Sequence, residues 1–201
     1  MTAPARILAA DPPWRYDDPL PGPSRGAARH YETMTMPELQ AFKLPPIAPE
    51  AWLFLWYTTA FKREAELLVD AWGFDPTGAE LTWVKTTRDA PFVLDPLARL
   101  GGGASGGFAN LAFGMGRTVR NCDERCIIAR RGRPRPASRS VRSVFFAPQP
   151  RHPTSGKIWH SAKPDRFYQL AEELAGEGPR VELFARTARP GWQALGLEAP
   201  L

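Results

Sequence analysis

The sequence predicts an α/β fold: a mostly parallel β-sheet with helices on both of its faces. Strand-like segments alternate with segments of helical spacing along the 201 residues, which is the pattern of consecutive βαβ units. The most apolar candidate strand, 51–57 (AWLFLWY), has no polar face, as expected of a strand that helices cover on both sides. No internal repeat or clear linker divides the chain, so we expect one domain over residues 1–201.

The first two elements have recognisable boundaries. Residues 6–10 (RILAA) form a short apolar run that stops at an Asp-Pro-Pro turn, which indicates a buried strand. Thr35 can cap the helix that follows, Pro37 is tolerated at an early helical position, and Glu38 completes a capping box.

The remaining elements continue the alternation. Residues 62–72 place Ala65, Leu68, Val69 and Trp72 at helical spacing before Gly73 ends the helix. A second amphipathic helix is expected over 164–175, with its apolar face formed by Phe167, Leu170, Ala171 and Leu174. The other expected strands are 81–85, 124–130, 144–147 and 180–185.

The composition indicates a basic protein with free thiols. Lys and Arg number 26 against 21 Asp and Glu, a formal net charge of +5, which suits a polyanionic partner, although arginine-rich codon usage gives the same excess. Cys122 and Cys126 have no histidines nearby, so they fit reduced thiols better than a metal site. Without a signal peptide or a membrane-length apolar run, we expect a soluble cytoplasmic protein and no membrane partner.

Two segments lack regular patterning. Residues 19–29 are rich in Pro, Gly and Ser, and residues 95–116 contain several glycine clusters. Segments of this length within a domain are usually functional or disordered. We expect at least one of them to close over a site, the alternative being a surface loop.

The most informative string is Asp11-Pro-Pro-Trp14, directly after the strand 6–10. Ligands of open α/β sheets bind beyond the carboxyl ends of the strands. The Asp11 carboxylate and the Pro12 carbonyl can each accept an N–H of an aromatic amine, and a carboxylate stabilises the charge that develops when the amine attacks. Trp14 can stack on the ring, and Pro12 and Pro13 fix the backbone. The string fits a pocket for adenine; an ordinary proline turn is the alternative.

Further motifs follow in a fixed order. They are His30-Tyr31-x-Thr33-Met34, Trp52-Leu-Phe-Leu-Trp56, Ala71-Trp-Gly-Phe74, Thr82-Trp-Val-Lys85, Arg120-Asn121, Ser161-x-Lys163-Pro164-Asp165, Glu182-Leu-Phe-Ala-Arg186 and Pro190-Gly-Trp192. The ordered set, over about residues 6–198, resembles the MT-A70 family of adenine-N(6) methyltransferases. The resemblance implies a Rossmann-like fold that uses S-adenosylmethionine, with the catalytic motif before the cofactor strand.

The resemblance also implies roles for individual residues. On the substrate side it implies that Asp11, Pro12, Pro13 and Trp14 contact the target amine and base. Tyr31 matches a tyrosine of the active-site loop, and Arg120 and Asn121 are expected to contact the nucleic acid. On the donor side it implies that Asp11 lies near the methionine moiety, that Lys163 meets the carboxylate, and that Arg186 lies near the ribose; His160 and Ser161 adjoin Lys163. Relatives often have Gly-Asn-Glu near the end, whereas this chain has Leu197 before Glu198, so of these two only Glu198 can accept from a ribose hydroxyl.

An arginine-rich stretch over 130–142 includes Arg133 and Arg135. We interpret it as a phosphate-contacting rim beside the pocket, the alternative being a solvated loop.

Together these observations predict methyl transfer from S-adenosylmethionine to the N6 amine of adenine. When the target is a duplex, the adenine must be flipped out of the base stack. We expect nucleic acid as partner, DNA before RNA, and no metal. RNA adenine methylation, cytosine-N(4) methylation and a non-catalytic nucleic-acid-binding subunit stay open, as does assembly into a homo- or hetero-oligomer.

Overall fold

The computed structural model describes residues 3–15, 33–87, 111–112, 118–159, 162–185 and 187–196. In chain order the elements are β1 (Ala5–Ala10), α1 (Met36–Gln40), β2 (Ile47–Tyr57), the 3-10 turn η2 (Thr59–Phe61), α2 (Lys62–Ala71), β3 (Asp75–Thr86), β4 (Asp123–Arg131), β5 (Val144–Pro148), α3 (Asp165–Ala175), β6 (Arg180–Leu183) and β7 (Gln193–Leu195). No helix in these ranges is long and apolar enough to cross a membrane.

The strands form one sheet in the order β5-β3-β4-β2-β1-β6-β7. Among the named strands every pairing is parallel except the two that β4 makes, with β2 and β3. The predicted α/β fold with a mostly parallel sheet is confirmed. Because β4 runs the opposite way, its amino end shares one edge of the sheet with the carboxyl ends of β1, β2, β3 and β6.

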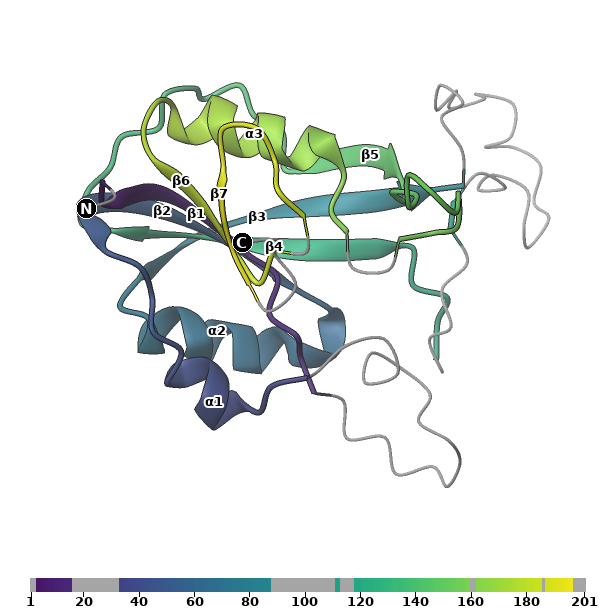
Figure 1. The fold of residues 1–201 in the computed structure, drawn as a ribbon, viewed down its shortest axis with the longest axis horizontal. Helices are drawn as coiled ribbons and strands as arrows, with labels where there is room; N and C mark the ends of the chain where they lie inside the picture. The colour runs from purple at the N-terminus through teal and green to yellow at the C-terminus, as the bar shows by residue number, and fades with distance from the viewer. Residues whose placement is uncertain are drawn as a thin grey trace.

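Helices cover both faces of the sheet. Figure 1 shows α1 and α2 below the sheet and α3 above it. The strand β2 supplies both cores, because successive side chains of a strand point to opposite faces. Leu53 and Leu55 join the core between the sheet and α2, whereas Phe54 and Trp56 join the core between the sheet and α3. The expectation that residues 51–57 are buried on both faces is therefore confirmed.

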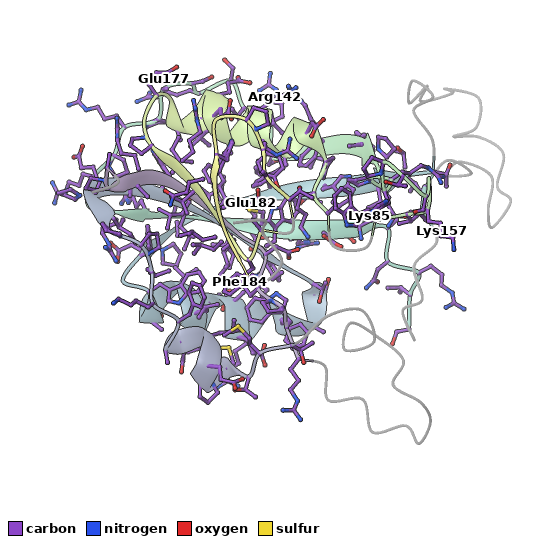
Figure 2. The ribbon with its side chains drawn as sticks, in the orientation of Figure 1. Lys85, Arg142, Lys157, Glu177, Glu182 and Phe184 are labelled. Carbon is purple, nitrogen blue, oxygen red and sulfur yellow. The ribbon has the colours of Figure 1, made fainter. Side chains whose placement is uncertain are left out.

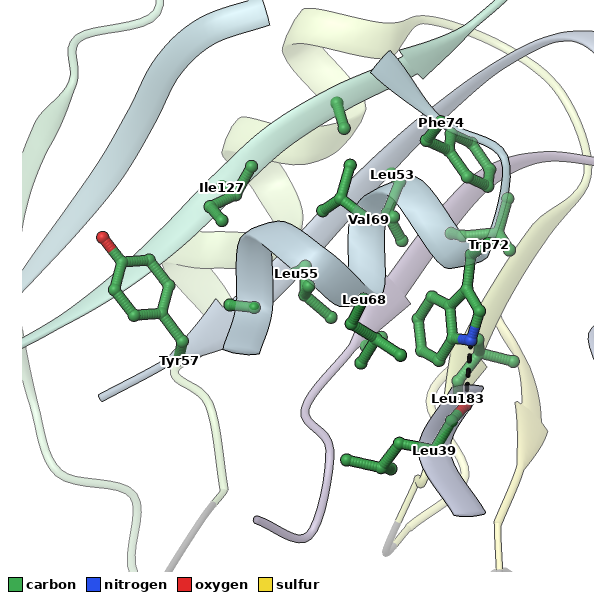
Figure 3. Close-up of a cluster of buried hydrophobic side chains, with 14 of the residues drawn as sticks. Leu39, Leu53, Leu55, Tyr57, Leu68, Val69, Trp72, Phe74, Ile127 and Leu183 are labelled. Atoms are coloured by element: carbon green, nitrogen blue, oxygen red, sulfur yellow. Dashed lines mark hydrogen bonds between the residues drawn. The ribbon is translucent and has the colours of Figure 1, made fainter. Parts of the chain in front are cut away.

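The core beneath α2 also ties the two lower helices together. Leu68 and Val69 of α2 are fully buried there. Trp72 follows α2 and donates its indole N–H to the carbonyl of Leu39 in α1, at 3.0 Å (Figure 3). The predicted capping box is present at the start of α1, where Thr35 caps the helix and Glu38 accepts the Thr35 backbone N–H at 2.7 Å.

Several elements differ from the sequence-based expectation. The strand β2 begins at Ile47 rather than at residue 51. The strand β3 begins at Asp75 rather than at residue 81, and its first part is irregular around Pro76, so it shows no strand alternation. The strand β6 ends at Leu183 because Phe184 adopts a positive φ of 59°. The short strand β7 carries too few residues for a pattern. Residues 19–29 and most of 95–116 lie outside the described residues.

Candidate active site

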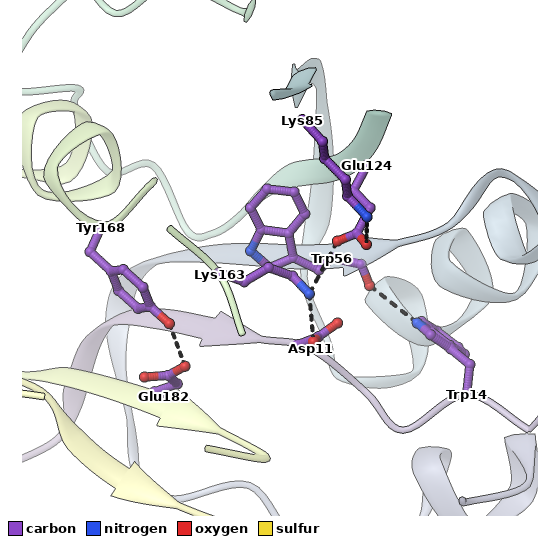
Figure 4. Close-up of polar contacts among 8 residues, drawn as sticks. All are labelled: Asp11, Trp14, Trp56, Lys85, Glu124, Lys163, Tyr168 and Glu182. Carbon is purple, nitrogen blue, oxygen red and sulfur yellow. Dashed lines mark hydrogen bonds and ion pairs between the residues drawn. The ribbon is translucent and has the colours of Figure 1, made fainter. Parts of the chain in front are cut away.

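Four charged side chains meet at the edge of the sheet where β1 ends. Asp11 follows β1, Lys85 lies near the end of β3, Glu124 lies at the start of β4, and Lys163 precedes α3. The Lys163 ammonium lies 2.6 Å from Asp11 Oδ2 and 3.2 Å from Glu124 Oε2. The other Glu124 oxygen accepts from Lys85 Nζ at 2.5 Å. Figure 4 shows the resulting chain of alternating charges, which we call the Asp-Lys-Glu-Lys chain.

Burial and charge act in opposite directions on this chain. Only 5% of the Lys163 side chain is exposed. Burial lowers the pKa of Lys163, but the neighbouring Asp11 and Glu124 carboxylates outweigh that effect, and the net pKa is raised. Burial likewise raises the pKa of Glu124, and the two lysines more than offset it, so the net pKa is lowered. Lys163 and Glu124 are therefore both ionised at neutral pH.

The Asp11-Pro-Pro-Trp14 string is held by hydrogen bonds and a ring contact, most of them with other segments of the chain. The Pro12 carbonyl accepts the Trp14 backbone N–H, and the Pro13 carbonyl accepts the Met34 N–H, both at 2.8 Å. The Trp14 indole donates to the Trp56 carbonyl at 3.3 Å. The Trp14 ring is buried and stacks on Phe61, with centroids 5.3 Å apart and planes 13° from parallel.

These contacts bear on the predicted roles of two residues. The Pro12 carbonyl already accepts one hydrogen bond within the chain, but a carbonyl oxygen has a second lone pair, so Pro12 can still accept from a substrate amine. The Trp14 ring has Phe61 as its partner among the described residues. Stacking of Trp14 on a base stays a prediction.

A cavity of about 710 Å³ opens beside Asp11 and Lys163, within the range of small-molecule sites. Its lining also includes Tyr168, Glu182 and Arg189. The Tyr168 hydroxyl donates to Glu182 at 2.5 Å, and the Arg189 guanidinium lies 3.7 Å from the centre of the Tyr168 ring. Burial raises the pKa of Glu182. The other lining residues are Phe146, Ala147, Pro148, Pro150, Arg151, Pro153, Trp159, Ala162, Pro164, Asp165, Arg166, Phe184 and Thr187.

The structure brings some of the predicted site residues together. Asp11 and Lys163 lie far apart in the sequence, yet they form an ion pair in the cavity wall. Arg120 and Asn121 are exposed and directly precede β4, at the same edge of the sheet as Asp11. Five further predicted site residues fall outside the described residues: Tyr31, His160, Ser161, Arg186 and Glu198.

The arginine-rich stretch lies away from the cavity rather than beside it as expected. Arg130, near the end of β4, pairs with Trp52 and with Asp75, the first residue of β3. The chain therefore leaves β4 at the edge of the sheet opposite to Asp11, and Arg133 and Arg135 do not line the cavity. Composition could not predict this position, because it does not reveal that β4 runs antiparallel to its neighbours β2 and β3.

Sequence reasoning missed several residues of the cavity and of the Asp-Lys-Glu-Lys chain. They are Lys85, Glu124, Tyr168, Glu182 and Arg189. A signal was present for Glu182, because a carboxylate inside the apolar strand RVELFA must be paired or functional. Glu124 gave no such signal, since it stands among charged residues at the start of its strand.

Comparison with known proteins gives one family. The MT-A70 model matches residues 5–100 and 108–198. The N(6)-adenosine-methyltransferase subunit METTL3 of Danio rerio is 26% identical over 94% of this chain and 27% of its own length, and the Homo sapiens METTL3 catalytic subunit is 25% identical with the same coverage. The type II methyltransferase M.MunI of a Mycoplasma species is 24% identical over 97% of this chain and 78% of its own length. The chain thus spans about a quarter of the length of the METTL3 relatives.

Proposed function

Because the chain belongs to the MT-A70 family, we propose that it transfers a methyl group from S-adenosylmethionine to the N6 amine of adenine in nucleic acid. The observation that supports this best is the position of Asp11. Its carboxylate follows β1, lies in the wall of the 710 Å³ cavity, and is held at 2.6 Å by the buried Lys163 ammonium. A fixed carboxylate suits a reaction in which positive charge develops on an attacking amine.

The donor set of the cavity fits S-adenosylmethionine, which supplies a methyl group activated by a sulfonium. Lys163 offers an ammonium for the carboxylate of the donor, as the family resemblance implies. Glu182 offers a carboxylate for an amine or hydroxyl, and Phe184 adds apolar surface. Arg186 and Glu198 are proposed for the ribose on the resemblance alone.

Asp11 is the proposed catalytic residue for the target amine. The adenine amine is a weak nucleophile because its lone pair is delocalised into the ring. Asp11 would accept one of its N–H groups, and the Pro12 carbonyl would accept the other. Because the amine gains positive charge as it attacks, the Asp11 carboxylate binds it more strongly in the transition state than in the ground state.

Lys163 and Glu124 act on Asp11 as positioning residues. The Lys163 ammonium holds one Asp11 oxygen, and Glu124 holds Lys163 from the other side. Orientation fixed before the substrate arrives lowers the barrier without further reorganisation. Trp14 and Pro13 complete the fixed loop.

We propose DNA as the substrate, with RNA as the second candidate. Support for DNA comes from M.MunI, because type II methyltransferases modify DNA and the chain matches 78% of that protein. Support for RNA comes from the METTL3 relatives, whose names specify adenosine.

The experiment is transfer of a labelled methyl group to matched DNA and RNA oligonucleotides, each single-stranded and duplex, followed by analysis of the product nucleosides. We expect N(6)-methyldeoxyadenosine from DNA at a higher rate than N(6)-methyladenosine from RNA. Labelling of RNA only would contradict the choice of DNA. N(4)-methylcytosine as the product would contradict the choice of base. Protein that binds the oligonucleotide but neither binds S-adenosylmethionine in calorimetry nor transfers methyl would indicate a non-catalytic subunit.

A further inference from the structure

Residues 150–159, which follow β5, are folded back on themselves, although they contain neither helix nor named strand. We call residues 150–159 (PRHPTSGKIW) the arm. Its two sides pair through an antiparallel bridge between Arg151 and Ile158. The His152 N–H donates to the Lys157 carbonyl at 2.8 Å, and the Trp159 N–H donates to the Pro150 carbonyl at 2.8 Å.

The tip of the arm is held by side chains as well as by backbone. The His152 ring accepts, at Nδ1, the backbone N–H groups of Thr154 at 3.2 Å and Ser155 at 3.4 Å. The Arg151 guanidinium donates to the Gly156 carbonyl at 2.8 Å. Gly156 has a φ of +65°, a conformation that glycine adopts without strain. The arm is therefore a defined structural unit before any ligand binds.

The arm carries uncompensated positive charge. Residues 149–163 contain no Asp or Glu. Arg151 and Lys157 are both exposed, and among the described residues neither has a carboxylate partner. Because Arg151 pairs with Ile158 and His152 with Lys157, the two cations belong to adjacent pairs of the arm and project from its two faces. The arm therefore presents one cation on each of its faces.

The arm also forms part of the cavity. Pro150, Arg151, Pro153 and Trp159 line it together with Asp11 and Lys163. Lys157 lies at the same end of the molecule as Lys85, away from Glu177 (Figure 2). The two arm cations thus stand near the cavity that contains Asp11, where a nucleic acid would have to pass to present an adenine.

We propose that the arm is a nucleic-acid clamp, in which Arg151 and Lys157 contact backbone phosphates next to the nucleotide that is methylated. This rests on the proposed function, because it assumes a nucleic-acid substrate at the cavity. Phosphates flanking a target base carry one negative charge each, and exposed Arg and Lys side chains are the groups that usually bind them. Because the arm is already ordered, little conformational entropy is lost when it binds.

The test measures how the binding constant for a fluorescein-labelled, adenine-containing DNA duplex depends on salt. Binding is measured by fluorescence anisotropy from 50 to 300 mM NaCl. In the double variant Arg151→Gln, Lys157→Gln we expect about tenfold weaker binding at low salt and a slope of log K against log salt reduced by about 1.8, the value for two lost phosphate contacts. The single variant Lys157→Gln, which removes no side-chain contact among the described residues, should lose about half of that slope.

The matched control is Arg133→Gln, Arg135→Gln, which removes the same charge at the opposite edge of the sheet. Its slope should equal that of the wild type. An equal loss of slope in the control would overturn the clamp, because it would show a general effect of net charge. So would an unchanged slope in the arm variants.

Calorimetry with S-adenosylmethionine separates the clamp from the donor site. Because Lys157 does not line the cavity, we expect unchanged donor binding in Lys157→Gln, and loss of donor binding with an intact salt slope in that variant would contradict the proposal. The two proposals also fail separately. If the wild type transfers methyl but the arm variants keep the wild-type slope, only the clamp is wrong. If the arm variants lose the slope but the wild type transfers no methyl, the clamp stands and the proposed activity fails.

Discussion

At the scale of single residues, Glu124 shows how a buried charge depends on its partners. Its carboxylate lies between two lysines, and its pKa is lowered from 4.5 because Lys163 and Lys85 outweigh the effect of burial. A carboxyl with a lowered pKa adds stability above its ordinary pKa, and this contribution is lost as the pH falls through the lowered value.

The variant Glu124→Gln should therefore lose stability at neutral pH and lose less at acid pH. At pH 7 we expect a decrease in the free energy of unfolding of roughly 1.5–3 kcal/mol, the usual contribution of hydrogen bonds to charged groups. The difference from the wild type should shrink as the pH falls below 4.5. Urea unfolding between pH 3 and 7 measures it. The control Glu66→Gln changes an exposed residue of α2 and should show no difference at any pH; a constant difference for Glu124→Gln would refute the assignment.

Individual residues of the site could be predicted from the sequence better than the contacts between them. Asp11 and Lys163 were predicted separately, one from the chemistry of its motif and both from the family resemblance. Their ion pair could not be predicted, because it depends on how β1 and the turn before α3 come together. Glu124 was missed for the same reason. Its role depends on ion pairs with Lys85 and Lys163, which come from other segments of the chain.

At the scale of elements, α2 stabilises the fold mainly through its buried face. Leu68 is fully buried in the core between α2 and the sheet, whereas its neighbour Leu67 is 49% exposed. We expect Leu68→Ala to lower the free energy of unfolding by about 2–5 kcal/mol, because it leaves a cavity in a packed core. Leu67→Ala should change it by less than about 0.5 kcal/mol. Equal effects in denaturant titrations would show that the packing of α2 is described wrongly.

Elements with a regular apolar pattern were predicted well, and those governed by tertiary context were not. The helix α2 follows from the helical spacing of its apolar residues, and the buried part of β2 follows from its continuous apolar run. The beginning of β3 has Pro76 and an irregular register, so it forms a strand only because β4 pairs with it. The end of β6 is set by the positive φ of Phe184, a conformation that no composition rule assigns to phenylalanine.

At the scale of the whole molecule, strand direction decides which charges reach the cavity. The reversal of β4 carries Glu124 to the edge where β1 ends and carries Arg133 and Arg135 to the other edge. A basic composition alone could not distinguish these two surfaces. The same topology brings Asp11, Lys163 and Glu182 together around the cavity, although they come from different segments of the chain.

Binding of the donor should stabilise the whole fold, because a ligand that binds only the native state adds to its stability. At 100 times the dissociation constant of S-adenosylmethionine we expect about 2.7 kcal/mol, or roughly 5–10 °C in Tm for a chain of this size. Lys163→Met should abolish this shift, since the ammonium for the donor carboxylate is gone. Differential scanning fluorimetry measures this shift in Tm. A shift of equal size in Lys163→Met would place the donor elsewhere.

The central claim is that the Asp11 carboxylate, held by Lys163, stabilises the charge that develops on the attacking amine. The most direct test is single-turnover methyl transfer by Asp11→Asn, which keeps the shape of the side chain and removes its charge. We predict a rate about 10²–10³-fold below that of the wild type, the usual effect of losing one preorganised transition-state contact, with the melting temperature and oligonucleotide binding retained. The control Asp123→Asn, a partly exposed carboxylate paired with Arg125, should transfer at the wild-type rate. A wild-type rate in Asp11→Asn would contradict the claim.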